Sequence, residues 1–237
     1  MSRHQLIVAL DVEDLAAANR LITTLSGEVK WFKIGKQLFT AVGPASVKLL
    51  HEAKKNIFLD LKFHDIPNTV AGAVASGTKL GANMINMHAS GGLEMMRAAA
   101  EAAEKQASEL GIPKPILLGV TVLTSVNEAN FQSDFGTQRK LEDQVAYLAE
   151  LSQEAGLDGV VASPLEIELI RKVCGDDFVI LTPGVRPAWA ASNDQQRVMT
   201  PAEAIDAGAD YIVVGRPITA ADNPRDAARA ILEEIDK

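Results

Sequence analysis

The stretch Ile57-Phe58-Leu59-Asp60-Leu61-Lys62-Phe63-His64-Asp65 places three charged residues at the end of an apolar run. Side chains alternate between the two faces of a strand, so Asp60 and Lys62 are expected to point the same way. Ions beside a core are costly unless they pair with each other or take part in chemistry. The pattern therefore predicts a lysine that carboxylates keep protonated and that faces a substrate.

Apolar runs of this kind alternate with helical patterns along the whole chain. Helices between strands imply parallel pairing through crossovers, and eight such units fit a closed (β/α)8 barrel better than an open sheet. We therefore predict an α/β protein, a single (β/α)8 TIM barrel made by residues 1–237. The eight expected strands span residues 5–11, 29–35, 56–62, 83–88, 115–123, 159–162, 178–182 and 210–215.

Three helix-to-strand junctions resemble one another. Each has a glycine, an apolar residue and then Asn or Asp, and each leads into an expected strand, the fourth, sixth or eighth. A repeated β/α unit would produce this pattern, although glycine also commonly ends helices. The three are Gly81-Ala82-Asn83, Gly156-Leu157-Asp158 and Gly208-Ala209-Asp210.

The composition is that of an ordinary soluble globular protein, with 47% hydrophobic and 23% charged residues. A net charge of −8 argues against a general nucleic-acid or anionic-membrane binder. Cys174 is the only cysteine, so an intrachain disulfide is impossible and the cytoplasm is the expected location. No run reaches the ~20 apolar residues that a transmembrane helix needs, and residues 6–10 are too few for a signal-peptide core.

Charged residues close three successive expected strands. Barrel enzymes place their chemistry at these C-terminal strand ends. One such charge could be a solvated loop residue or part of a simple ion pair. Alternating signs at three strand ends instead predict an active-site array that holds a lysine ammonium group in place. The array contains Asp11, Lys33, Asp60 and Lys62, with Asp65 just beyond.

The array favours acid catalysis over imine chemistry. A protonated, rigidly held lysine is suited to act as a general acid. A Schiff-base lysine needs surroundings that make it neutral, and flanking aspartates do the opposite. They also place negative charge where a substrate carboxylate could sit, which would favour its loss as CO2.

A divalent metal is the alternative use of these aspartates, with His64 and His88 as further ligands. Lys33 and Lys62 argue against it, because each ammonium group competes with a cation for the same oxygens. We therefore predict no metal. His64 is interpreted as a packing or hydrogen-bonding residue, and the role of His88 is open.

Two arginines follow the seventh and eighth strands, where barrels often bind a phosphate. Gly215 allows close backbone approach, and Arg216 can bind two oxygens in a fork, unless it is a plain surface residue. Arg186 lies at the same corner. The polar stretch 187–200 also follows the seventh strand, and a loop of this length is usually a lid or disordered. Its position at the active-site end favours a lid.

Taken together, these residues resemble the orotidine 5′-phosphate decarboxylase family of the bacterial type over essentially the whole chain. The segment Asp60-Leu61-Lys62-Phe63-His64-Asp65-Ile66-Pro67-Asn68-Thr69 is highly specific to that family. The remaining matches agree in order and spacing. They are Ala9-Leu10-Asp11, Phe32-Lys33-Ile34-Gly35, Leu123-Thr124-Ser125, Thr182-Pro183-Gly184-Val185-Arg186 and Val214-Gly215-Arg216.

The resemblance implies decarboxylation of orotidine 5′-monophosphate to uridine 5′-monophosphate in de novo pyrimidine biosynthesis, without cofactor or metal. Lys62 would donate the proton to C6 of the pyrimidine, and Asp60 would lie beside the departing carboxylate. Lys33 and Asp65 would complete the catalytic network. The family is a homodimer, so Asp65, Ile66 and Thr69 would reach into the neighbour's pocket.

The resemblance also implies a set of nucleotide-binding residues, to which Asp60, Ile66 and Thr69 belong. Asp11 and Lys33 would bind ribose hydroxyls, and Thr124 would meet the base. The phosphate would be held by Arg186, Gln195, Gly215 and Arg216, with the loop that contains Gln195 closing over it. Gln195 is preferred here to its neighbour Gln196.

Two rival functions remain. A related Mg²⁺-dependent barrel acts on keto-sugar phosphates and shares the Asp-x-Lys-x-x-Asp segment, but it carries a glutamate metal ligand where this chain has Lys33. A non-catalytic nucleotide-binding barrel would be expected to lose members of the array, yet all are present.

Overall fold

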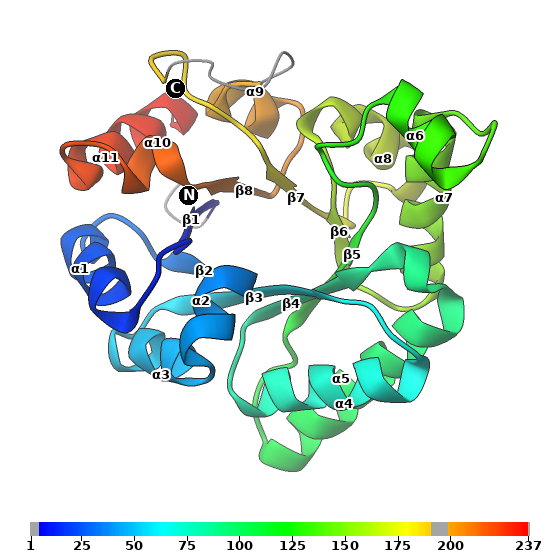
Figure 1. The fold of residues 1–237 in the computed structure, drawn as a ribbon, viewed down its shortest axis with the longest axis horizontal. Helices are drawn as coiled ribbons and strands as arrows, with labels where there is room; N and C mark the ends of the chain where they lie inside the picture. Colours follow the sequence, from blue (N-terminus) through cyan, green and yellow to red (C-terminus); the bar gives the residue numbers. More distant parts are fainter. Residues whose placement is uncertain (1–4, 191–198, 237) are drawn as a thin grey trace.

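The computed structural model describes residues 5–190 and 199–236. Eight parallel strands close into a barrel in sequence order, and helices surround it (Figure 1). The predicted (β/α)8 fold is confirmed, and every expected strand is present within a few residues of its expected bounds. The strands are β1 Leu6–Ala9, β2 Trp31–Gly35, β3 Asn56–Phe63, β4 Met84–His88, β5 Ile116–Val120, β6 Gly159–Val161, β7 Val179–Pro183 and β8 Tyr211–Val214.

Several helices begin or end at recognisable capping residues. In the last helix the Asn223 side chain accepts a hydrogen bond from the Asp226 N–H, and Pro224 takes the first helical position. Helix α5 ends at Gly111, which adopts the left-handed conformation. The helices are α1 Leu15–Leu25, α2 Lys36–Val42, α3 Ala45–Glu52, α4 Pro67–Lys79, α5 Leu93–Leu110, α6 Glu128–Phe135, α7 Leu141–Glu154, α8 Ile167–Cys174, α9 Pro201–Asp206, α10 Arg216–Thr219 and α11 Pro224–Ile235, with short 3-10 turns η2 Ala89–Gly91 and η3 Pro164–Glu166.

Strand alternation divides the core into two layers. Residues such as Val8 and Leu59 face outward and pack beneath the helices. Their sequence neighbours face inward and fill the barrel, as expected of a packed barrel interior. The inner layer contains Ile7, Ala9, Trp31, Phe58, Met84, Leu118, Val120, Val161, Leu181 and Val213.

The three similar junctions form one repeated structure at the N-terminal end of the barrel. In each, the glycine has a positive φ, between 81° and 108°, which glycine adopts without strain. The Asn or Asp side chain then accepts a hydrogen bond from a backbone N–H of the preceding strand. The pairs are Asn83 with Ile57 (2.9 Å), Asp158 with Leu117 (2.7 Å) and Asp210 with Ile180 (2.8 Å). The sequence repeat is therefore a structural repeat.

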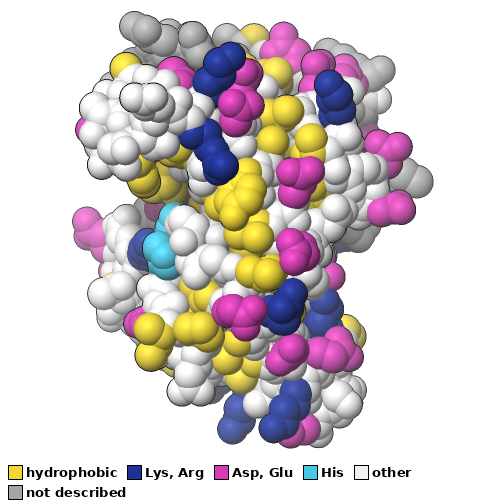
Figure 2. Space-filling view, turned by 90° about the vertical axis from the view of Figure 1, so that its right-hand side faces the viewer, with side chains coloured by type: hydrophobic (Ala, Val, Ile, Leu, Met, Phe, Trp, Pro, Cys, Tyr) yellow, Lys and Arg dark blue, Asp and Glu magenta, His cyan; other side chains and the backbone are white. Residues whose placement is uncertain are grey.

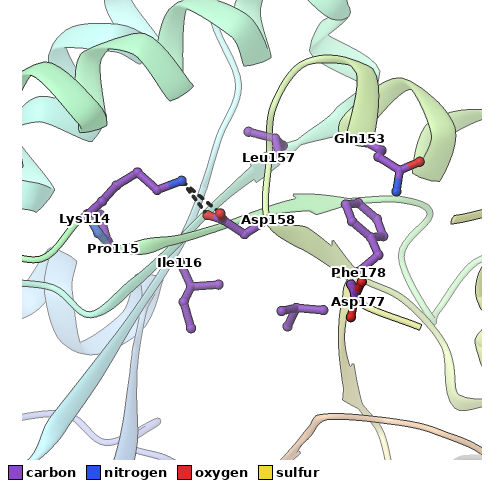
Figure 3. A pocket seen from close by; sticks show the side chains of 9 residues that line it. Lys114, Pro115, Ile116, Gln153, Leu157, Asp158, Asp177 and Phe178 are labelled. Carbon is purple, nitrogen blue, oxygen red and sulfur yellow. Dashed lines mark hydrogen bonds and ion pairs between the residues drawn. The ribbon is translucent and has the colours of Figure 1, made fainter. Parts of the chain in front are cut away.

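A cavity of about 490 Å³ opens at this same N-terminal end (Figure 3). Its lining includes Ile116 and Val179, the first residues of β5 and β7. Lys114 points to the carboxylate of Asp158 and donates to it at 2.8 Å. This cavity lies away from the C-terminal strand ends, where the predicted array is found.

The side of the barrel seen in Figure 2 carries a mixed surface. Hydrophobic side chains form a discontinuous band, and acidic and basic side chains are interspersed around it. Neither sign of charge dominates the part of this face that the structure describes.

Candidate active site

The predicted charged array is assembled at the C-terminal end of the barrel. The Lys33 ammonium lies 3.0 Å from Asp11 Oδ1 and 3.2 Å from Asp60 Oδ2. The Lys62 ammonium lies 2.5 Å from the other oxygen of Asp60, Oδ1. Asp60 therefore joins two lysines that come from different strands. The structure brings together four of the five charged residues that the sequence predicted to form the array.

Strand alternation explains how these residues come to face one another. Asp11, Lys33 and Asp60 each follow an inner-layer residue by two positions, so their side chains point into the barrel. The charges thus form the next layer above the apolar interior. The pairs are Ala9 with Asp11, Trp31 with Lys33, and Phe58 with Asp60.

Gly35 makes room for the array. A β-carbon at this position would lie 2.7 Å from Lys33 Nζ and 2.8 Å from Asp11 Oδ1. Those separations are shorter than a carbon atom tolerates. Any side chain at this position would force the Lys33 and Asp11 side chains apart.

Lys62 reaches Asp60 through an irregularity in β3 and not through regular alternation. Its φ is 51°, in the left-handed region that non-glycine residues rarely adopt. The pairing with β4 shifts at the same place, because Leu59 pairs with Ile85 whereas Phe63 pairs with Met87. Four steps along β3 thus correspond to two along β4. The prediction that Asp60 and Lys62 meet is confirmed, but a bulge turns the lysine toward the carboxylate.

Asn86 on β4 is part of the site, and the sequence analysis missed it. Its side chain is fully buried, at 0% exposure. The amide group donates to Asp60 Oδ1 at 2.7 Å and accepts the backbone N–H of Lys62 at 2.9 Å. The sequence did hold a clue. Met84, Asn86 and His88 occupy alternate positions of a largely apolar strand, so alternation places the polar Asn86 inward with Met84.

Asp60 is held as a carboxylate although it is nearly buried. Lys33 and Asp60 are each 8% exposed. Burial alone would raise the pKa of Asp60, but the ammonium groups of Lys33 and Lys62 and hydrogen bonds from Lys62 and Asn86 outweigh it. The pKa of Asp60 therefore lies below its usual value. A negative charge is thereby fixed between two positive ones.

His88 lies beside the array as a neutral imidazole. Burial, together with positive charge from His64, Lys36 and Lys62, lowers the pKa of His88 to about 4. The ring centroids of His64 and His88 are 5.3 Å apart. In this arrangement His88 adds no permanent charge to the site at neutral pH.

The donor set does not fit a metal ion. Both oxygens of Asp60 already accept a lysine ammonium group, and Asp11 accepts the ammonium of Lys33. Within residues 5–190 and 199–236, no group of three or more His, Cys, Asp or Glu side chains is arranged to hold a metal. The absence of a metal from the working protein stays a prediction.

The segment between β3 and α4 lies on the surface next to the array. Asp65, Ile66 and Thr69 are exposed, and Ile66 is 66% exposed. The Asp65 carboxylate accepts the N–H of Ile66 at 2.6 Å. Within the described part of the chain it forms no ion pair with Lys33 or Lys62. Its predicted place in a neighbour's pocket stays a prediction.

The expected phosphate residues come from the ends of β7 and β8. Arg216 is exposed and begins α10 directly after Gly215, and Arg186 is half-buried beyond β7. Among the residues that the structure describes, a β-carbon at Gly215 would meet the Ala9 side chain at 3.7 Å, which is an ordinary contact distance. Thr124 is exposed after β5.

The polar stretch after β7 is described only at its two ends. The backbone N–H of Arg186 donates to the carbonyl of Met199 at 3.0 Å, which holds these ends together. Gln195 and Gln196 lie outside the described residues.

Comparison with known proteins identifies the family of the chain. A model of the "Orotidine 5'-phosphate decarboxylase / HUMPS family" matches residues 4–231. The chain belongs to this family. It is 54% identical over 235 residues to orotidine 5′-phosphate decarboxylase of Moorella thermoacetica, covering 99% of this chain and 93% of the relative. It is 53% identical over 234 residues to the same-named protein of Syntrophotalea carbinolica, covering 99% and 96%.

A solved structure supports the same assignment. The crystal structure of orotidine 5′-phosphate decarboxylase from Lactobacillus acidophilus matches with a TM-score of 0.87 at 36% identity, covering 99% of this chain and 100% of that one. The family resemblance drawn from residues 60–69 is therefore confirmed. None of the helices in the described ranges is long and apolar enough to cross a bilayer.

Proposed function

We propose that this protein decarboxylates orotidine 5′-monophosphate to uridine 5′-monophosphate in de novo pyrimidine biosynthesis, with Lys62 as the proton donor and without cofactor or metal. The observation that carries the proposal is the Asp60 carboxylate, buried and shared by the ammonium groups of Lys33 and Lys62. Membership of the family supports the choice of reaction.

The reaction needs a proton at the carbon that loses CO2. When the bond between C6 and the carboxylate breaks, its electron pair stays on C6. The Lys62 ammonium would stabilise that charge and transfer a proton to C6, and water would later return a proton to the lysine. Asp60 would lie beside the departing carboxylate, where its negative charge favours release of neutral CO2.

Binding of the rest of the nucleotide would be shared among the neighbouring strand ends. Asp11 and Lys33 would bind the ribose hydroxyls, and Thr124 would meet the base. The phosphate would be held by residues that follow β7 and β8, namely Arg186, Gln195, Gly215 and Arg216. Contacts to this non-reacting phosphate can stabilise a closed loop that excludes water from the charged site.

The site would be completed by a second copy of the chain. Asp65, Ile66 and Thr69 are exposed beside the array, and in a homodimer they would reach the partner's substrate. The exposed apolar surface of Ile66 supports this, because a subunit contact would bury it. The cytoplasm is the proposed location, where the single Cys174 would stay reduced.

The test is the loss of orotate-ring absorbance when the purified protein is mixed with orotidine 5′-monophosphate. We expect full activity without added metal and in excess chelator. Inactivity of the wild-type protein on this nucleotide would overturn the proposal, and loss of activity in chelator would point to the metal-dependent rival.

The phosphate role is tested separately with Arg216→Ala. This change removes a forked phosphate contact and leaves the array unaltered, so we expect a large rise in KM. An unchanged KM and kcat in Arg216→Ala would rule out the phosphate role.

A further inference from the structure

We infer that Asn86 is a positioning residue that fixes both the Asp60 carboxylate and the backbone of Lys62. The inference rests on the proposed function, because it assigns a role within the same site. Asn86 is the one fully buried polar side chain on β4, and both ends of its amide group are used by the array.

The partners of Asn86 determine which way its amide group points. A backbone N–H can only donate, so the atom facing Lys62 N is the amide oxygen, at 2.9 Å. A carboxylate can only accept, so the atom facing Asp60 Oδ1 is the amide nitrogen, at 2.7 Å. The asparagine amide offers one donor group and one acceptor atom, and each has a hydrogen-bond partner here.

The contact with Lys62 replaces a missing rung of the sheet. The register of β3 against β4 breaks between Leu59 and Phe63, and Lys62, with its left-handed φ, lies within this span. A non-glycine residue in that conformation is strained and persists only where its surroundings hold it. The backbone N–H of Lys62 donates to the amide oxygen of Asn86 on β4, so a side chain bonds this N–H at the place where the register breaks.

The contact with Asp60 sets the orientation of the carboxylate. Asp60 Oδ1 receives both the Asn86 amide and the Lys62 ammonium, while Oδ2 faces Lys33. Rotation of the carboxylate would break all three contacts. Asn86 therefore ties the proton donor and the charge beside it to one point on a rigid strand.

The first experiment compares Asn86→Ala with Asn83→Ala. Asn83 is a matched control. It directly precedes β4 and also accepts a backbone N–H of β3, that of Ile57 at 2.9 Å, but at the opposite end of the barrel. For Asn86→Ala we expect kcat to fall by about 10- to 100-fold, the range seen when a group supporting an active site is removed. KM and the affinity for uridine 5′-monophosphate should change little, and Asn83→Ala should keep the wild-type kcat.

The second experiment uses pH to separate positioning from folding. Asn86→Asp still accepts the Lys62 N–H but puts a second carboxylate against Asp60, and two such groups share a proton with one raised pKa. When protonated, the new side chain can donate to Asp60 as the amide does. We expect the ratio of variant to wild-type kcat to rise by about tenfold or more as the pH falls from about 8 to about 5.5.

The other titratable groups around Asn86 do not mimic this response. Lys33, Lys62, Lys36 and His64 are present in both proteins, so the ratio compares two sites that differ only in the side chain at position 86. His88 has a pKa of about 4 and stays neutral over this range.

The outcomes separate the two proposals. An inactive wild-type protein defeats the proposed function. An active wild-type protein with an unchanged kcat in Asn86→Ala and a flat ratio in Asn86→Asp overturns the role of Asn86. If Asn86→Ala does not fold, the pH ratio of Asn86→Asp decides, because its protonated form has nearly the shape of asparagine.

Discussion

The two ends of the barrel use the same kinds of charged residue in different ways. At the N-terminal end, Asp158 binds a backbone N–H of β5 and the ammonium of Lys114. Asp210 likewise binds a backbone N–H of β7 and the guanidinium of Arg171. At the C-terminal end, Asp60 binds two ammonium groups and a side-chain amide.

The difference lies in what each carboxylate holds in place. An aspartate that accepts a backbone N–H fixes the start of a strand and satisfies a buried donor. An aspartate bound to side-chain cations fixes those cations instead. The N-terminal carboxylates therefore stabilise the fold, as expected for that face of a barrel, and the C-terminal carboxylate, under the proposed function, holds charges in place for a substrate.

Removing one aspartate from each end gives the largest contrast. In Asp60→Ala, the two lysines lose their common partner, so we expect kcat to fall by at least about 100-fold, as misplacement of a reacting group can do. In Asp158→Ala, we expect unchanged kcat and a loss of about 1–3 kcal/mol in the free energy of unfolding. Steady-state kinetics and urea unfolding measure the two effects. Equal loss of kcat in both variants would contradict the division between the ends.

Arg171 tests the stabilising end alone. Its side chain is 16% exposed, and it donates to Asp210 and to the carbonyls of Gly175, Asp176, Phe178 and Gly208. For Arg171→Ala we expect a loss of about 3 kcal/mol in unfolding free energy, because the carbonyl of buried Phe178 and the half-buried Gly208 carbonyl and Asp210 carboxylate lose this donor. The kcat of the folded protein should not change.

Arg97→Ala is the matched control for Arg171→Ala. Arg97 pairs only at the surface, at 3.3 Å with Glu94 and 4.0 Å with Glu154, so we expect less than about 1 kcal/mol. A stability loss as large as that of Arg171→Ala would show that burial does not set the strength of these pairs.

Glu166 tests a charge at the C-terminal end that is not part of the array. Burial raises its pKa to about 7, against a hydrogen bond from Ser163 that lowers it. The folded protein thus favours the neutral acid of Glu166. The contribution of this group to the free energy of unfolding is present at low pH and is lost as the pH rises through about 7. Glu166→Gln stays neutral, and we expect its advantage over the wild type to grow from pH 5 to pH 8 by on the order of 1 kcal/mol.

Glu203→Gln provides the comparison. Glu203 forms a capping box with Thr200, three residues before it, just as Glu166 does with Ser163. Hydrogen bonds from Thr200 lower the pKa of Glu203, and its side chain is exposed. Its substitution should therefore not stabilise the protein at pH 8. The same gain in both variants at pH 8 would rule out burial as the cause. Thermal unfolding across pH measures both.

Most of the fold could be predicted from the sequence because alternation and glycine punctuation are local. Each apolar run became a strand, and the Gly-x-Asx junctions became one repeated structure. The strand ends were less exact: residues 121–123 were expected in β5, which ends at Val120. That boundary depends on pairing with β6, which ends with Val120 opposite Val161, and Thr121 beyond it donates its N–H and its hydroxyl to the Val161 carbonyl.

The site was predicted in part. Alternation places Asp11, Lys33 and Asp60 in one inward layer. The bulge at Lys62 could not be predicted, because it is visible only as a shift in register between two strands. Asn86 was missed since a single amide in an apolar strand carries no charge, although its inward position was already readable.

The role of Lys62 as proton donor is tested most directly by comparing two lysine variants. The measurement is the rate of orotate-ring absorbance loss for Lys62→Ala and for Lys114→Ala. We expect Lys62→Ala to lose turnover by about 100- to 10,000-fold or more, the contribution of a general acid, and still to bind uridine 5′-monophosphate. Lys114→Ala should keep the wild-type rate. A Lys62→Ala protein that decarboxylates the nucleotide as fast as the wild type would contradict the account.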